Sequence, residues 1–371
     1  MVTKMLALAA SLIMTVSACL SQSRPADLSL VELPEGFEIS VFADGLENAR
    51  SIEHADDGVV YVSTRSLGSV YALVDDDQDG VADRKFTVAT GLTLPNGIAH
   101  RNGSLFVSDG GRIVRLDNIG SNLDDPPEPV VVVDDLPEDA HHGWRYMDFG
   151  PDGRLYVSIG APCNVCLRDD PYAAIISMEP DGADRRIVAR GVRNSVGFTW
   201  SPVEDSFWFT DNGRDHLGDD LPSCELNRLT EEGAHYGFPF VHESDVLDPE
   251  FGEGHDASSY VAPAFDLGAH VAPLGIEFYT GNMFPPSYRN QLFVAEHGSW
   301  NRSKKVGYRV VLVRFDENGE PVREEVFADG FLQGDDAWGR PVDLEQLPDG
   351  SLLLSDDRVG AVYRISYSAD D

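Results

Sequence analysis

The chain has 371 residues, a length that accommodates one large β domain or two domains of ordinary size. Its 63 aspartates and glutamates outnumber its 28 lysines and arginines, which gives a formal net charge of −35. Such a charge repels the phosphates of nucleic acids and anionic membrane surfaces, so neither is an expected partner. An anionic ligand would need a local cluster of arginine or lysine side chains.

Residues 1–18 have the pattern of an export signal. Lys4 supplies a positive charge, and the apolar run from Leu6 to Val16 is too short to span a membrane. The run Val16-Ser17-Ala18-Cys19 matches a bacterial lipobox, which predicts a lipid on Cys19 and a tether over residues 19–32. We therefore expect an exported lipoprotein in the outer membrane, facing the periplasm or the cell surface. The alternative is an ordinary secretory signal that contains this cysteine by chance.

A repeated unit fills residues 33–371. A turn, a short apolar strand and a small or acidic residue recur six times, at residues 57–63, 102–108, 152–158, 205–210, 290–295 and 349–355. A second type of strand, which ends in a small or acidic turn, recurs at residues 37–45, 86–91, 130–134, 187–191 and 326–330. Copies of one unit at this spacing, with four strands each, predict an all-β fold, a six-bladed β-propeller. A two-domain sandwich would not explain six matching units.

The order of the strands predicts how the ring closes. The repeat begins with an outer strand, residues 37–45, and ends with a third strand, residues 362–367. The N-terminal strand is therefore expected to complete the last blade and to leave no open sheet edge.

An acidic stretch lies between two strands of the first unit. Asp75, Asp77, Asp79 and Asp83 alternate with other residues around Gly80, as oxygen ligands do in a calcium loop. An EF-hand would need glutamate at the twelfth position, where Phe86 stands. The stretch is either a structural calcium loop or a plain acidic turn.

Strand order also sorts the loops onto two faces. The outer-to-inner loops and the second-to-third loops share one face, and they carry six arginines: Arg50, Arg145, Arg193, Arg214, Arg302 and Arg340. Guanidinium groups match carboxylates, so this face suits a polyanionic small ligand. The alternative for each arginine is a salt bridge between blades.

One of these loops carries the run His141-His142-Gly143-Trp144-Arg145. Histidine titrates near neutral pH, which suits proton transfer. The alternative is a packed tryptophan with two surface histidines.

Elsewhere, Cys163, Cys166 and Cys224 allow at most one disulfide in an oxidising compartment, either within Cys163–Cys166 or from one of these to Cys224.

At these loops the sequence resembles the soluble sugar dehydrogenases that depend on pyrroloquinoline quinone (PQQ), the glucose/sorbosone dehydrogenase family, and especially its sorbosone-dehydrogenase-like branch. The resemblance covers about residues 33–367. The matching runs are residues 141–145, 160–166, 193–198, 209–215, 225–227, 233–239, 295–302 and 338–341.

The resemblance implies a propeller that holds PQQ on a calcium ion. The family's spacing of histidine, three residues and arginine places the catalytic base at His141, with His142 as the adjacent alternative. The other implied roles are contacts with the cofactor from Arg193, Asn194 and Arg340, and backbone contacts with the cofactor's calcium from Gly213 and Arg214. Trp338 stands where another cofactor arginine occurs in the family, and Arg302, Lys304 or Lys305 would replace the cofactor lysine.

The resemblance therefore implies an enzyme that oxidises a sugar, or a related aldehyde or alcohol, and passes electrons to a quinone or a cytochrome. A calcium-dependent hydrolase such as a lactonase is the first alternative, but that chemistry needs a metal held by carboxylates in the channel. A non-catalytic binding lipoprotein is the second alternative.

Overall fold

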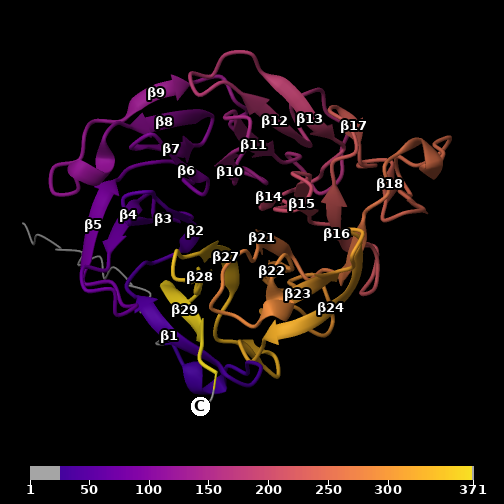
Figure 1. Cartoon of the computed structure of the whole chain (residues 1–371). Coiled ribbons are helices and arrows are strands. Elements are labelled where there is room, and N and C mark those ends of the chain that lie inside the picture. The colour runs from indigo at the N-terminus through magenta and orange to yellow at the C-terminus, as the bar shows by residue number, and fades with distance from the viewer. Residues whose placement is uncertain (1–25, 370–371) are drawn as a thin grey trace, which may run out of the picture.

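The computed structural model describes residues 26–369, which form a ring of six blades, each built on four antiparallel strands (Figure 1). The predicted six-bladed propeller is thus confirmed. From the inner to the outer strand, the first blade is β2 (Ala49–His54), β3 (Val60–Thr64), β4 (Val70–Val74) and β5 (Arg84–Ala89), and the second is β6 (Ile98–Arg101), β7 (Ser104–Asp109), β8 (Arg112–Leu116) and β9 (Val130–Val133). The third blade is β10 (Met147–Phe149), β11 (Leu155–Ile159), β12 (Ala174–Met178) and β13 (Arg186–Arg190), and the fourth is β14 (Phe198–Trp200), β15 (Phe207–Asp211), β16 (Ser223–Arg228) and β20 (Phe265–Ala269). The fifth blade is β21 (Pro273–Phe278), β22 (Leu292–Glu296), β23 (Arg309–Phe315) and β24 (Pro321–Ala328), and the sixth is β27 (Pro341–Gln346), β28 (Leu352–Asp356), β29 (Ala361–Tyr367) and β1 (Phe37–Ala43).

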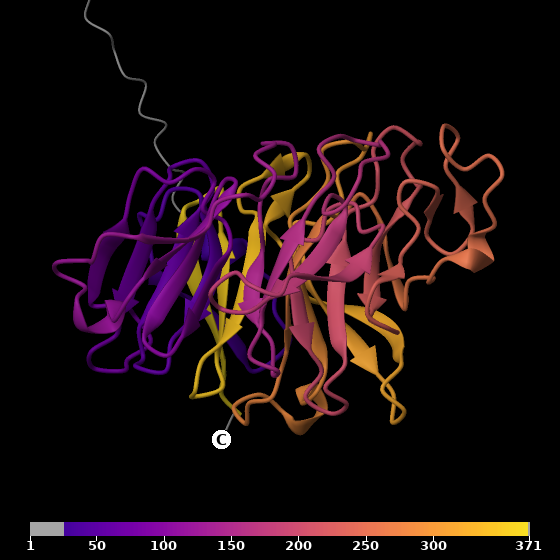
Figure 2. The same ribbon diagram turned by 90° about the horizontal axis from the view of Figure 1, so that it is seen from above.

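The remaining elements are short. A long excursion between β16 and β20 contains β17 (Ala234–His235), which pairs with β13 in parallel, and a hairpin of β18 (Val241–His242) and β19 (Val246–Leu247). It extends outward from the ring at the right of Figure 1, and Figure 2 shows it beside the blades. A second hairpin joins β25 (Leu332–Gln333) to β26 (Asp336–Ala337), and the described helices are four 3-10 turns: Leu28–Leu30, Ile119–Ser121, Ala257–Ser259 and Pro286–Tyr288.

The ring closes as the sequence predicts. Strand β1 pairs antiparallel with β29, with Phe37 opposite Tyr367 and Ile39 opposite Ile365. This pairing joins the two ends of the chain in the sixth blade, at the bottom of Figure 1.

Phe37 anchors the closing strand in an aromatic cluster. Its ring centroid lies 4.8 Å from that of Phe284, 5.1 Å from Tyr288, 5.0 Å from Phe327 and 4.9 Å from Tyr367, each in an edge-on arrangement. These partners belong to the fifth and sixth blades, so one side chain ties β1 to both.

The innermost strands surround the centre of the ring and carry several carboxylates (Figure 1). Asp343 of β27 accepts a hydrogen bond from the Ile52 backbone N–H at 3.0 Å, and Glu53 of β2 accepts one from the His100 N–H at 2.9 Å. These carboxylates therefore bond the inner edge of one blade to the next blade.

The carboxylates of the innermost strands also repel one another, as Asp148 and Asp343 do with Glu277. Burial first, and then the charges of Asp148 and Asp343, raise the pKa of Glu277 to about 8. Burial also raises the pKa values of Asp148 and Asp343 to about 7. These carboxyl groups therefore keep their protons at higher pH than ordinary carboxyl groups do.

The structure also shows which cysteines within residues 26–369 form a disulfide. Cys163 and Cys166 form a disulfide, and Cys224 is buried without a disulfide partner.

Cys19 and the predicted signal lie outside the described residues, so export and lipid anchoring stay predictions. Within residues 26–369, no helix has the length and apolar character that crossing a bilayer requires.

Closure by β1 can be tested with Phe37→Ala. Removing a buried phenylalanine should lower the free energy of unfolding by about 3–5 kcal/mol. Chemical denaturation measures this loss, and Val322→Ala, at a side chain that is 50% exposed, is the control. A loss below about 1 kcal/mol would show that the cluster does not hold the ring closed.

The carboxylates at the centre predict a specific dependence on pH. Glu277 binds its proton more tightly in the folded state, so its contribution to stability falls as pH rises from about 4.5 to about 8. Glu277→Gln should therefore raise the free energy of unfolding at pH 8 by about 1–3 kcal/mol and change it little near pH 4.5. Denaturation at both pH values, with the exposed Glu317→Gln as control, checks this. A variant that is less stable than the parent at pH 8 would contradict it.

Candidate functional site

A cavity of about 310 Å³ opens among the loops of one face of the ring. Most of its wall comes from outer-to-inner and second-to-third loops, the two types that strand order predicts to meet. The lining residues are Arg50, Arg65, His142, Trp144, Arg193, Asn194, Val196, Asn212, Gly213, Asp215, Cys224, His270, Ala272, Leu274, His297, Gly298, Trp300, Asn301 and Arg340.

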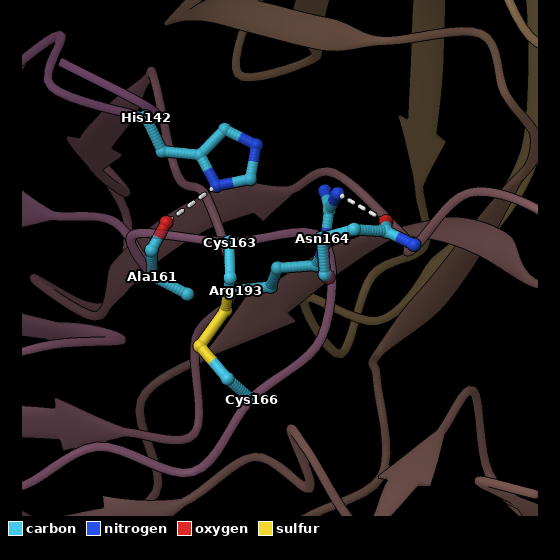
Figure 3. The surroundings of a disulfide bond; sticks show 6 residues. All are labelled: His142, Ala161, Cys163, Asn164, Cys166 and Arg193. Atoms are coloured by element: carbon cyan, nitrogen blue, oxygen red, sulfur yellow. Dashed lines mark hydrogen bonds between the residues drawn. A yellow bond between two sulfur atoms is a disulfide. The ribbon is translucent and has the colours of Figure 1, made fainter. Parts of the chain in front are cut away.

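Of the two adjacent histidines, His142 lines the cavity and His141 does not. His141 is exposed, and its ring lies beside that of His142, with 4.2 Å between the centroids. Nδ1 of His142 lies 2.8 Å from the carbonyl oxygen of Ala161, which fixes the ring and turns its other nitrogen away from that carbonyl (Figure 3). A Cβ at Gly160 would lie 2.5 Å from the His142 Cβ, so glycine is needed for this close approach.

The imidazole of His142 is held in its neutral form. Burial, then the nearby charges of Arg193 and His141, lower its pKa to about 2, against a small opposing effect of the Ala161 carbonyl. With Nδ1–H donating to Ala161, Nε2 is the unprotonated nitrogen and can accept a proton.

Arg193 and Asn194 lie in the loop between β13 and β14, and both line the cavity. Their backbone N–H groups donate to the two carboxylate oxygens of Asp211, at 2.7 and 2.6 Å. Burial raises the pKa of Asp211 to about 7, although these hydrogen bonds oppose the shift. A buried carboxylate at the end of β15 therefore fixes the backbone of the arginine–asparagine pair.

Gly213 and Arg214 follow β15 after one intervening residue, Asn212. Gly213 lines the cavity, and its contact with the cofactor's calcium stays a prediction. The Arg214 guanidinium instead binds Asp248 at 2.5 Å and Glu250 at 3.3 Å, both in the excursion before β20. That side chain therefore anchors the excursion, and only the Arg214 backbone remains for the predicted role.

Arg340 lines the cavity beside a buried ion-pair network. Arg50 binds Asp357 at 3.2 Å, and Nε2 of His297 lies 2.9 Å from the other oxygen of the same carboxylate. Burial alone would raise the pKa of Asp357, but His297, Arg50 and Arg340 outweigh it and lower that pKa. Burial lowers the pKa of His297 to about 4. Asp357 consequently remains ionised and holds two cavity side chains.

Two predicted cofactor residues are not on the cavity wall. Trp338 is buried, stacks on Phe331 at 5.2 Å and donates its indole N–H to the Gly330 carbonyl at 2.8 Å. It therefore belongs to the hydrophobic core. Arg302 binds the loop with Asp219 and Asp220, with 2.9 Å to the Asp220 carboxylate. Neither placement offers a side chain to a ligand in this cavity.

Arg145 of the same histidine loop is also turned inward. It is buried and donates to the carbonyl oxygens of Pro137 and His142, at 2.5 and 3.4 Å. Its role is to shape the loop that carries His142.

The sequence reasoning missed Arg65 and Asp357. Arg65 lines the cavity and lies over the Trp144 ring, 4.5 Å from its centroid. Both residues belong to second-to-third loops, at the ends of β3 and β28. The signal was therefore available, because strand order assigns those loops to the cavity face.

The acidic loop between β4 and β5 is partly assembled as predicted. Carboxylate oxygens of Asp75, Asp77 and Asp83 all lie within 4.8 Å of one another. Asp79 is outside this group, and its carboxylate accepts the Val81 N–H at 2.9 Å. The calcium loop stays a prediction with three gathered carboxylates in place of four.

The cavity wall is strongly cationic for so acidic a protein. Four of its lining residues are arginines, Asp215 is the single carboxylate among them, and the whole chain carries −35. This wall can bind a compact anion through charge-assisted hydrogen bonds, next to a neutral histidine that can accept a proton.

The chain is similar to known proteins over most of its length. The family model described as TrAA12-like matches residues 31–240 and 225–368. An "Uncharacterized protein" of Borreliella burgdorferi is 34% identical over 354 residues, which cover 91% of each chain. A PQQ-dependent sugar dehydrogenase of Hypocrea jecorina is 24% identical and covers 91% of this chain and 89% of its own.

Solved structures show the same fold. The holo form of the pyranose dehydrogenase PQQ domain from Coprinopsis cinerea superposes with a TM-score of 0.79 at 20% identity, over 93% of this chain and 98% of that one. The resemblance to PQQ-dependent soluble sugar dehydrogenases is confirmed, and the sorbosone-dehydrogenase-like branch stays a prediction. Because its model matches almost the whole propeller, the chain belongs to the TrAA12-like family.

Proposed function

We propose that this protein is an oxidoreductase that binds PQQ with a calcium ion in the cavity and oxidises a sugar. The observation that carries the proposal is one cavity wall that combines Arg193, Asn194 and Arg340 with His142 and the Gly213 backbone. The named function of the Hypocrea jecorina relative, a PQQ-dependent sugar dehydrogenase, supports it.

The residues present fit such a cofactor. PQQ is a planar quinone with three carboxylates, and the wall offers four guanidinium groups against one carboxylate. Arg193 and Arg340 would bind cofactor carboxylates through forked hydrogen bonds, and Asn194 would donate its amide. The backbone carbonyls of Gly213 and Arg214 would serve the calcium ion, which prefers oxygen ligands.

His142 would act as the general base. Its Nε2 would accept the proton of the hydroxyl that is oxidised, while the Ala161 carbonyl holds the Nδ1–H tautomer. When bound, the quinone supplies the acceptor for the hydride that leaves the same carbon. Burial, and then the charge of Arg193, lower the pKa of His142, which favours return of this proton to solvent.

The substrate class that we propose is a sugar or a related aldehyde or alcohol, with a quinone or cytochrome as electron acceptor. The hydrolase alternative is not favoured, because Asp215 is the single carboxylate among the residues that line the cavity. A catalytic calcium held by protein side chains would need several oxygen ligands there.

Binding of the quinone can be measured by its effect on stability. A ligand at a hundred times its Kd should raise the free energy of unfolding by about 2.7 kcal/mol. We expect thermal unfolding to shift upward with PQQ and Ca²⁺ together, and less with PQQ and a chelator. Arg340→Gln should reduce the shift, whereas Arg323→Gln, at a distant exposed arginine, should preserve it. No shift in the parent protein would refute the proposed function.

The two histidines can be separated by dye-linked turnover. His142→Ala should lower kcat by roughly 10²–10⁴-fold, the usual contribution of a general base. His141→Ala should retain kcat within about tenfold, because His141 does not line the cavity. Quinone affinity, measured for both variants, separates loss of the base from loss of the cofactor. The opposite ranking of the two variants would assign the base to His141.

A further inference from the structure

The disulfide Cys163–Cys166 closes a ring of four residues in the loop between β11 and β12. Asn164 lies within this ring and faces Arg193 (Figure 3). Neither Asn164 nor the two cysteines line the cavity, so the ring is not part of its wall.

Asn164 accepts hydrogen bonds from Arg193 with both its backbone and its side chain. Its carbonyl oxygen accepts from Nε of Arg193 at 2.8 Å, and its Oδ1 accepts from Nη2 at 3.0 Å. The Asn212 carbonyl accepts from Nη1 at 2.9 Å, and the Asp215 carboxylate lies 3.4 Å from Nη2. Four contacts leave at least one of the five guanidinium N–H groups for a ligand in the cavity.

The same side chain also holds the loop that follows β15. Oδ1 of Asn164 accepts from the Asp215 backbone N–H at 2.8 Å, and Nδ2 donates to the Asp215 carbonyl at 3.1 Å. Gly213, two residues earlier, is in the cavity wall. One amide therefore connects three loops: its own, the Arg193 loop and the Gly213–Asp215 loop.

The amide has a chemical advantage over a carboxylate here. It uses both an acceptor and a donor, and it orients the guanidinium without adding a second negative charge beside that of Asp215. An aspartate at this position would form an ion pair with Arg193 and compete with an anionic ligand.

We propose that Asn164, held in place by the Cys163–Cys166 ring, is a positioning residue that presents Arg193 and the Gly213 backbone to the cofactor. The effect on the cofactor rests on the proposed function. The contacts themselves do not, so the inference has one test with the quinone and one without it.

In the first test, Asn164→Ala should raise the Kd for PQQ, measured by titration in Ca²⁺, by about tenfold or more, which corresponds to about 1.4 kcal/mol. Cys163→Ser/Cys166→Ser should raise it in the same direction, because the backbone carbonyl that binds Nε is released. In an Arg193→Lys background, Asn164→Ala should raise Kd by a smaller factor than in the parent, since coupled residues are not additive and only the contacts with the Gly213–Asp215 loop remain. Asn122→Ala, at an exposed asparagine bonded to the Asn118 carbonyl, is the matched control.

A purely structural role would lower the melting temperature of Asn164→Ala and leave Kd unchanged, and that result would overturn the proposal. An equal loss in the Arg193→Lys background would overturn the claim that Asn164 acts through Arg193.

The second test uses the protein without quinone. Hydrogen–deuterium exchange measures how fast the Asp215 backbone amide exchanges with solvent. This exchange should be at least about tenfold faster in Asn164→Ala, because the Asn164 Oδ1 that accepts from the Asp215 N–H is gone. If the parent protein bound no quinone, the proposed function would fail and this measurement alone would decide the positioning role. Unchanged exchange at Asp215 would then refute it.

Discussion

The pairing of β1 with β29 is the constraint on which the rest of the molecule depends. It joins strands from opposite ends of the chain and so fixes the sixth blade between the first and the fifth. Arg50 of the first blade meets Asp357, a residue 307 positions later, only because the ring is closed. The cationic cavity is therefore a product of ring closure.

Two opposite electrostatic environments share the axis of this ring. At the cavity face, arginines gather around few carboxylates, and burial together with their charges keeps His142 and His297 neutral. On the innermost strands, burial and then the charges of neighbouring carboxylates raise the pKa values of Glu277 and Asp343. A negatively charged ligand is thus attracted to one face of a protein whose overall charge would repel it.

The sequence was sufficient for the architecture because each blade repeats the same apolar second strand. All six of these strands occur where the repeat predicts them, and the terminal strand closes the ring. The outer strand of the fourth blade, β20, was not predicted because a long excursion separates it from β16. Strand order then assigned the loops to faces, which brought Arg193, Asn194, Gly213 and Arg340 together before any contact was known.

Side-chain direction was beyond the reach of this reasoning. The family resemblance favoured His141 with His142 as the alternative, and the Ala161 carbonyl holds the ring of His142 where it lines the cavity. Trp338 and Arg302 are in the expected loops, but one packs in the core and the other binds an acidic loop. The pairing of Cys163 with Cys166, left open by counting cysteines, depended on the same local geometry.

The most direct test of the central claim is a crystal structure of the protein grown with PQQ and Ca²⁺. The account predicts one quinone in the cavity, with its carboxylates within hydrogen-bonding distance of Arg193 and Arg340 and a calcium ion at the Gly213 carbonyl. A quinone bound elsewhere on the surface, or a cavity that excludes it at saturating concentration, would contradict the account.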